Sequence, residues 1–298
     1  MNKIIDPHLH FFELTQGHYQ WLKQGNPPFW PDKHKLRHHF HEQSLTLKQD
    51  AVLAGFVHIE AGFDNTKPWR EIAWLESSCN LPFKTVAGID LTLKEDDFKE
   101  SISQLLLYPS VVGCRHILDE QAYELLSHKN VQHNLAYLAK NQLSFDLQMP
   151  LADKHSVDVL LDLLNHLPTL RLIINHGGWP PLNDASIDDS TPSAWQQWQT
   201  NVVALSQFEH CVIKCSAWEM LDRNYDKQWQ QEVITQCLKA FGSQRVMLAS
   251  NFPLVLLTQN YHTLWEQYLN LDATLNLTSE QITALTYANA AYWYKFNL

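Results

Sequence analysis

Short apolar runs recur along the whole chain and alternate with segments of helical pattern. Eight runs rich in β-branched residues predict buried strands, over residues 3–6, 51–60, 84–90, 111–118, 143–149, 170–176, 211–216 and 245–250. The intervening segments, such as residues 120–140 and 151–167, are long enough for a helix that returns the chain to the next strand. Eight strands alternating with helices in 298 residues predict an α/β protein, a single-domain (β/α)8 TIM barrel spanning residues 1–298.

An open, doubly wound sheet is the alternative architecture, but no glycine-rich phosphate fingerprint follows any of the expected strands. The chain closes with LTSEQITALTYANAAYWYKF. Within it Thr278 and Gln281 have the spacing of a capping box, and Ile282, Leu285 and Tyr292 repeat at helical spacing. We therefore expect a terminal helix that packs on the barrel.

Two connections that follow expected strands are unusually long. Residues 11–39 carry Trp21 and Trp30, and residues 177–193 carry Trp179, two prolines and an acidic stretch. Loops after barrel strands lie at the face where active sites are built. These loops are thus expected over the barrel mouth, either as lids of a site or as insertions that only cover it.

Charge and composition limit the classes of partner that the protein can bind. The formal charge is −10, and no basic cluster is longer than Lys33-His34-Lys35, whereas nucleic-acid binding needs a positive field. The N-terminal segment lacks the apolar core of a signal peptide, and no run of about 18 apolar residues occurs. The five cysteines are scattered, as expected for reduced thiols. We expect a cytoplasmic monomer or homodimer that acts on a small molecule, with no nucleic-acid or membrane partner.

Histidine is abundant, with 16 in the chain, so position decides which histidines matter. The sequence DPHLH ends the first expected strand, and side chains two apart on a strand share a face. His8 and His10 are therefore able to hold one metal ion or one substrate together. A second His-x-His sequence, His39-Phe40-His41, is expected to be helical.

A third histidine, His176, closes the apolar run LRLIIN and precedes two glycines that indicate a tight turn. It projects at the same rim as His8 and His10, or it caps its strand by bonding a loop carbonyl.

The fourth expected strand carries neighbouring basic residues, Arg115 and His116, of which only one can face inward. An inward Arg115 would grip a substrate carboxylate with two parallel hydrogen bonds. An inward His116 would join the other histidines, and Arg115 would then pair with an acidic residue of a helix.

Several polar residues interrupt otherwise apolar strands. The pairs that share a strand face are Asp146 with Gln148, Lys214 with Ser216, and His58 with Glu60. Buried polar groups are costly unless they are paired, so we expect each of them at the barrel mouth or beside a partner.

The order of the motifs resembles one family. DPHLH, GCRHIL, FDLQM, INHGG, IKCSAW and ASNFP, together with the ANAAYWYKF ending, are similar to the amidohydrolase-related branch that contains L-fuconolactonase, L-rhamnonolactonase and pyrone-dicarboxylate lactonase. The similarity spans essentially the whole chain. It implies a hydrolase that opens a sugar-acid or related lactone by attack of water on the ester carbonyl.

The resemblance matches His8, His10, His176, Arg115 and His116 to residues of the family, and the strand and loop patterns add further candidates. The expected metal ligands are His8, His10 and His176. The expected catalytic residues are His176, Asn251, His116 and Asp146, and the expected substrate-binding residues are Arg115, Glu60, Gln148, Lys214, Trp218 and Trp179. The cofactor stays open between one divalent metal ion, with zinc as the first choice, and no metal at all.

One residue departs from the family pattern. Asn251 stands where many members carry the aspartate that orients the hydrolytic water and removes its proton. An amide can orient water but cannot act as a general base, and loss of a base costs on the order of 10²–10⁴ in rate. The candidate substitutes are His8, His10, His176, Asp146 and Glu60, with histidine favoured by its intrinsic pKa and His176 placed first.

Three functions compete at this point. Lactone hydrolysis leads. Carbon–carbon bond cleavage is a second alternative, because decarboxylases also resemble this family, although they generally retain the aspartate that Asn251 replaces. The same replacement motivates the third alternative, a barrel that binds a ligand without catalysis.

Overall fold

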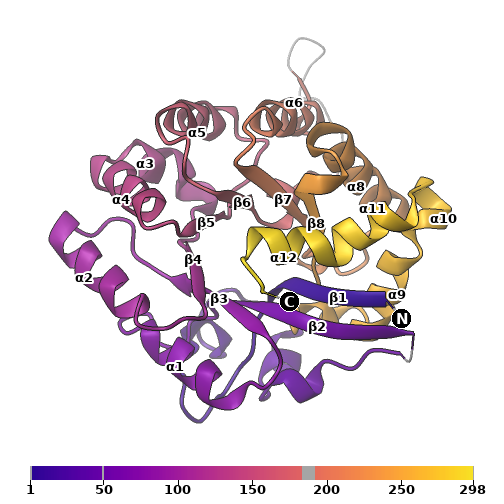
Figure 1. Cartoon of the computed structure of the whole chain (residues 1–298), viewed down its shortest axis with the longest axis horizontal. Coiled ribbons are helices and arrows are strands. Elements are labelled where there is room, and N and C mark those ends of the chain that lie inside the picture. The colour runs from indigo at the N-terminus through magenta and orange to yellow at the C-terminus, as the bar shows by residue number, and fades with distance from the viewer. Residues whose placement is uncertain (1, 49, 183–191, 298) are drawn as a thin grey trace.

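A computed structural model of the chain describes residues 2–48, 50–182 and 192–297 and arranges eight parallel strands in one sheet (Figure 1). The strands neighbour one another in sequence order from β1 to β8. Leu9 of β1 pairs with Phe252, just after β8, and this bridge closes the sheet. The predicted single-domain (β/α)8 barrel is confirmed.

Every expected strand is present. Their bounds are β1 Asn2–Leu9, β2 Ala51–Ile59, β3 Phe83–Gly88, β4 Val111–Arg115, β5 Ser144–Leu147, β6 Leu172–Ile174, β7 Cys211–Cys215 and β8 Val246–Leu248. β1 extends beyond its predicted end and thereby includes His8. The other strands end before their predicted limits, because their last residues already turn into the loops at the barrel mouth.

Helices surround the sheet (Figure 1). They are α1 Trp69–Ser78, α2 Glu95–Leu105, α3 Ala122–Ser127, α4 Lys129–Lys140, α5 Lys154–His166, α6 Ala194–Ser206, α7 Trp218–Leu221, α8 Lys227–Phe241, α9 Tyr261–Leu269 and α10 Leu271–Leu275. The single helix predicted over 120–140 is divided into α3 and α4. His128 is extended there, and its ring accepts a hydrogen bond from the backbone N–H of Asn130.

Apolar side chains pack in two layers. A large outer layer fills the space between the strands and the helices. An inner layer fills the barrel and is formed by Ile5, Val57, Ile59, Val86, Val112, Ile173, Val212 and Met247. Both layers follow from the alternation of side chains along the strands, and the inner one makes the barrel a packed core with its site at one end.

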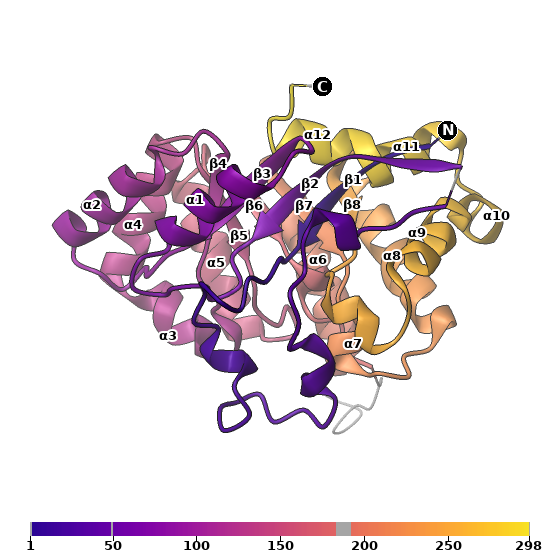
Figure 2. The same cartoon turned by 90° about the horizontal axis from the view of Figure 1, so that it is seen from below.

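The predicted terminal helix is confirmed and covers the end of the barrel where the strands begin (Figure 2). It consists of α11 Ser279–Thr283, a π-helical turn over Ala284–Ala288 and α12 Asn289–Trp293. The capping box of Thr278 and Gln281 is formed. Trp293 and Tyr294 join the inner layer, so the opposite end of the barrel is left for the site.

β1 changes its pairing register near Pro7. Ile5 belongs to the inner layer and Leu9 to the outer layer, and the pairing with β2 shifts between Asp6 and Leu9. The irregularity turns His8 toward the barrel interior even though it lies three residues after the inward-facing Ile5. Bulges of this kind are a common way to re-aim a side chain beside a site.

The long segment after β1 lies at the carboxyl ends of the strands (Figure 2). The prediction of a helix at His39-Phe40-His41, within this segment, is wrong, because Phe40 forms an antiparallel bridge with Phe12. The acidic stretch of the second long connection lies outside the described residues. In the described ranges, no helix is both long and apolar enough to cross a membrane.

Candidate active site

A cavity of about 760 Å³ opens at the carboxyl ends of the strands. Polar residues at strand ends form its floor, namely His10, Glu60, Arg115, Gln148, His176 and Asn251. Aromatic residues and prolines form its walls, including Trp21, Pro27, Pro28, Trp30 and Trp179. Both long connections thus contribute to the enclosure.

The three predicted histidines come together, with His10 and His176 on the floor of the cavity and His8 packed against both of them outside the lining. The ring of His8 lies 5.1 Å from that of His10 and 4.5 Å from that of His176, measured between centroids. Burial lowers the pKa of all three imidazoles, and it lowers that of His10 to about 3. The Arg115 cation lowers all three pKa values further, and Lys214 adds to the effect on His8 and His176. The three rings are therefore neutral at neutral pH.

His10 has a defined tautomer. Its Nδ1 lies 2.8 Å from the backbone oxygen of Ile59. A carbonyl only accepts hydrogen bonds, so Nδ1 carries the hydrogen and Nε2 has the free lone pair. His176 Nδ1 lies 3.0 Å from the hydroxyl of Ser216, which can donate or accept and leaves that tautomer open. His10 is thus the best-defined proton acceptor on the floor.

A left-handed turn positions His176. It spans residues 176–179, which have φ angles between 50° and 67°. A Cβ on Gly178 would lie 2.2 Å from Cγ of Leu151, so this position requires glycine. The turn presents the ring of His176 to the cavity at the end of β6.

Lys214 and Asp146 form a buried ion pair beneath the histidines. Lys214 Nζ lies 2.6 Å from Asp146 Oδ2, and the hydroxyl of Tyr294 donates to the same oxygen over 2.7 Å. Burial lowers the pKa of Lys214 to about 8, although Asp146 opposes the effect. Lys214 Nζ also lies 3.3 Å from His8 Nδ1. Neither member of the pair lines the cavity, so both support the floor from below.

The barrel histidines do not fit a shared divalent metal ion in this arrangement. His8 Nε2 is buried and has no hydrogen-bond partner among the described residues, but the charged ammonium of Lys214 adjoins the same ring and would repel a bound cation. Among the described residues, one group of three ligand residues has its ligand atoms within 4.8 Å of one another, and it lies outside the cavity.

Arg115 faces the cavity, and its neighbour His116 does not line it. Arg115 Nε and Nη2 contact the Glu60 carboxylate at 2.9 and 2.7 Å, and Nη1 donates to Gln148 Oε1 over 3.1 Å. The two parallel hydrogen bonds that were predicted for a substrate carboxylate are thus formed with Glu60 instead. Nδ1 of His116 instead accepts the backbone N–H of Leu91 over 3.0 Å.

Asn251 is held by a carboxylate that the sequence analysis missed. Its Nδ2 donates to Oε1 of Glu219 over 2.7 Å, and both side chains are buried. Burial raises the pKa of Glu219 to about 7. Asn251 has a left-handed backbone with φ 55°, a conformation that asparagine tolerates better than most residues. With its amide nitrogen engaged, the amide oxygen remains as an acceptor.

The two predicted tryptophans have different positions. Trp179 lines the cavity, packs on His176 with ring centroids 4.7 Å apart, and donates from Nε1 to Asp119 over 3.0 Å. Trp218 is buried outside the cavity lining, and its Nε1 donates to the hydroxyl of Tyr268 over 2.9 Å. Trp179 is therefore placed to touch a substrate, and Trp218 is placed to support the structure.

Comparison with known sequences finds relatives over almost the whole chain. A family model described as Amidohydrolase matches residues 5–296. An uncharacterized protein of Sinorhizobium fredii is 26% identical, with 98% of each chain covered. The L-fucono-1,5-lactonase of Burkholderia multivorans is 26% identical over 86% of this chain and 84% of its own length.

Solved structures share the fold. A zinc-bound amidohydrolase from Burkholderia multivorans has a TM-score of 0.77 at 19% identity, covering 98% of this chain and 99% of its own. A putative 2-pyrone-4,6-dicarboxylic acid hydrolase from Pseudomonas putida has a TM-score of 0.65 at 18% identity, covering 100% and 99%. A 2,6-dihydroxybenzoate decarboxylase from Rhizobium has 0.63 at 12% identity, covering 100% of both chains. Hydrolases and decarboxylases thus share this fold.

Proposed function

We propose that this chain, which belongs to the amidohydrolase family, is a hydrolase. The substrate that we propose is a small lactone of the sugar-acid class. The observation that carries the proposal is a neutral imidazole with a defined free nitrogen, that of His10, on the same cavity floor as the Arg115 cation. The L-fucono-1,5-lactonase among the relatives supports the choice of a cyclic ester.

In the proposed reaction, a water oxygen attacks the carbonyl carbon of the lactone, and the ring bond between that carbon and oxygen breaks. In the substrate-free protein the pKa of His10 is lowered to about 3. The negative charge that develops on the attacked carbonyl raises this pKa during the reaction. His10 Nε2 then takes the proton of the water and returns it to the departing ring oxygen, which becomes a hydroxyl. Asn251 orients the water through its amide oxygen. The product is a hydroxy acid, whose carboxyl group releases one proton at neutral pH.

Arg115 supplies positive charge for the oxyanion that develops during the attack. Its contacts with Glu60 and Gln148 fix the guanidinium before substrate binds, and fixed charges of this kind need no reorganisation during the reaction. One such group contributes roughly 10²–10³ in kcat. Arg115 therefore acts on the reacting carbonyl in this scheme, and not on a remote carboxylate of the substrate.

The test is proton release from a panel of aldonolactones. Chelator-treated enzyme is assayed alone and with added Zn²⁺ or Mn²⁺. We expect at least one lactone to be opened and the chelated enzyme to remain active, because the scheme uses groups of the protein only. A panel that stays intact under all conditions would reject lactone hydrolysis.

The same preparations are assayed for carbon dioxide release from dihydroxybenzoates. Lactone opening without carbon dioxide supports the proposal. The reverse outcome assigns carbon–carbon cleavage, which the shared fold also permits. Absence of both activities, with saturable binding of a lactone, would indicate a ligand-binding barrel in place of an enzyme.

A further inference from the structure

The second His-x-His sequence forms one face of a small antiparallel pair outside the cavity. Phe12 and Phe40 exchange two backbone hydrogen bonds of 3.0 Å each, and both phenylalanine side chains are buried. Neighbouring residues on a strand face the opposite side. Glu13 therefore lies across from His39 and diagonal to His41, and all three side chains share the face that the phenylalanines do not occupy.

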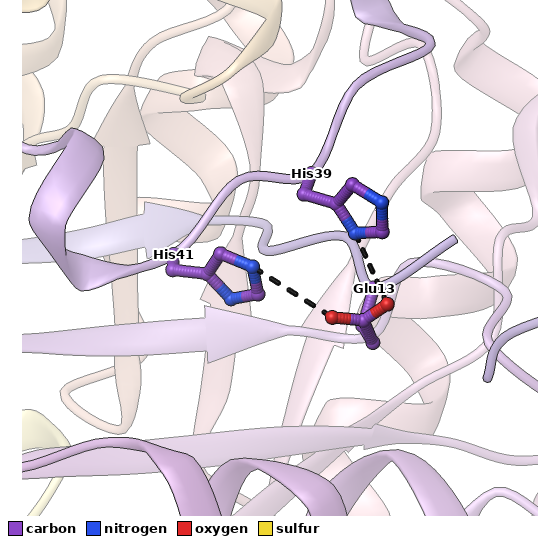
Figure 3. A group of neighbouring side chains, drawn as sticks. All are labelled: Glu13, His39 and His41. Carbon is purple, nitrogen blue, oxygen red and sulfur yellow. Dashed lines mark ion pairs between the residues drawn. The ribbon is translucent and has the colours of Figure 1, made fainter. Parts of the chain in front are cut away.

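Figure 3 shows both imidazoles turned toward the carboxylate. His39 Nδ1 lies 3.0 Å from Glu13 Oε1, and His41 Nε2 lies 3.8 Å from Glu13 Oε2. One ligand atom from each residue lies within 4.8 Å of the other two. Ligand atoms that surround a tetrahedral zinc ion are separated by roughly 3.4 Å. A small movement of the rings thus brings all three onto one ion.

The carboxylate is fixed and the imidazoles are adjustable. The backbone N–H and the hydroxyl of Thr15 both donate to Glu13 Oε1, over 3.1 and 2.5 Å. The Glu13 side chain is only 14% exposed, whereas His39 and His41 are 45% and 37% exposed. Thr15 contacts only Oε1, so Oε2 is left to bind an ion, and the exposure of the two rings gives solvent water access to the cluster.

We propose that Glu13, His39 and His41 bind one divalent transition-metal ion of the zinc type, with water completing the coordination. Two imidazoles and a carboxylate are a donor set that suits zinc. None of the three residues lines the central cavity, so the site is separate from the floor to which we assign hydrolysis and does not depend on that assignment.

The ion would fasten the base of a loop that forms part of the cavity wall. Glu13 lies just after β1, and His39 lies where the chain returns to pair with it. The segment between them carries Trp21 and Trp30, which line the cavity. An ion that binds the folded loop and not the unfolded chain stabilises the fold by its binding free energy. The proposed role is therefore a structural staple.

Metal-stripped full-length protein is titrated with Zn²⁺ alone, and bound zinc is counted after gel filtration. The double variant His39→Asn/His41→Asn should bind one equivalent of zinc less than wild type. His38 is an exposed neighbour outside the cluster, and His38→Asn should bind as much zinc as wild type. Zinc at 100 times its dissociation constant should raise Tm by roughly 5 °C in wild type and in His38→Asn. The double variant should show no such shift.

Cobalt substitution reports on the ligands directly. Wild type, His38→Asn and His10→Asn should all develop the visible absorption of four-coordinate Co²⁺, and the double variant should not. Equal zinc stoichiometry in wild type and the double variant would overturn the proposal, as would loss of the equivalent in His10→Asn. If circular dichroism shows the double variant to be unfolded, Glu13→Gln replaces it with the same expectations.

Discussion

The chain uses the His-x-His sequence twice, and the two copies have opposite electrostatic surroundings. The first pair, with His8 on β1 and His10 just after it, is buried beside the cations Lys214 and Arg115. The pair that follows the long loop is partly exposed and faces the carboxylate of Glu13. Burial, together with the neighbouring cations, keeps the first pair neutral. Cations also repel a metal ion, whereas a carboxylate attracts one. The groups opposite the motif, and not the motif itself, decide its chemistry.

Lys214→Met should cause the largest loss of stability, because it leaves Asp146 buried without its cation. Loss of one partner of a buried ion pair costs about 3–5 kcal/mol. Lys154→Met breaks the exposed pair with Asp158 and should cost less than about 1 kcal/mol. Urea unfolding at neutral pH measures both variants. Similar losses would contradict the contrast drawn between the interior and the surface.

Glu219→Gln should change how stability depends on pH. The pKa of Glu219 is raised from 4.5 to about 7 in the folded protein, so its contribution is fully present below the unfolded pKa and is lost as pH rises through 7. Each pKa unit corresponds to about 1.4 kcal/mol. Wild type should therefore lose roughly 3 kcal/mol relative to the variant between about pH 4 and pH 8. Parallel stability curves in urea would rule this out.

Asn251→Asp should destabilise the site at high pH rather than restore a general base. The new carboxylate would lie against Glu219 Oε1, which is now 2.7 Å from the amide nitrogen. Two adjacent carboxylates cannot both ionise without penalty. We expect a loss of about 1–2 kcal/mol at pH 8 that disappears at pH 5, and recovery in Asn251→Asp/Glu219→Gln. If Asn251→Asp alone is as stable as wild type at pH 8, the expected repulsion between the two carboxylates is absent and the prediction fails.

Trp179→Phe should have the smallest effect and should act on substrate binding. The change removes the hydrogen bond to Asp119 but keeps an aromatic ring in the cavity wall. Asp119 fixes the orientation of the Trp179 ring in the wall, so loss of the bond should weaken the contact of the ring with substrate. We expect a rise in KM of about 2–10-fold with kcat nearly constant. Trp218→Phe, which loses a bond to Tyr268, should alter stability and leave KM unchanged. A rise in KM in Trp218→Phe with an unchanged KM in Trp179→Phe would contradict the roles given to the two rings.

Sequence pattern was sufficient for the barrel and for much of the cavity floor. The strand runs carry their own signal, because β-branched residues and alternation are local properties. Strand ends converge at one face of any parallel barrel, which brought His10, His176, Arg115 and Asn251 together without further information.

The features that sequence did not predict depend on contacts between distant residues. The extended conformation at His39 and His41 requires Phe12 as a partner, and helical spacing alone cannot reveal such a pairing. Arg115 faces inward, as one of the two predicted alternatives stated. Only the fold shows that its guanidinium already forms an ion pair with Glu60. Glu219 had a usable signal, a single carboxylate in an apolar run just after a strand.

The most direct test of the contrast between the two motifs is kcat/KM for lactone opening by chelator-treated His10→Asn. Asparagine keeps an N–H for the Ile59 carbonyl but has no basic nitrogen. We predict a loss of roughly 10²–10⁴ relative to wild type, with less than about a twofold change in His38→Asn. A His10→Asn enzyme as active as wild type would contradict the assignment of proton transfer to the buried pair.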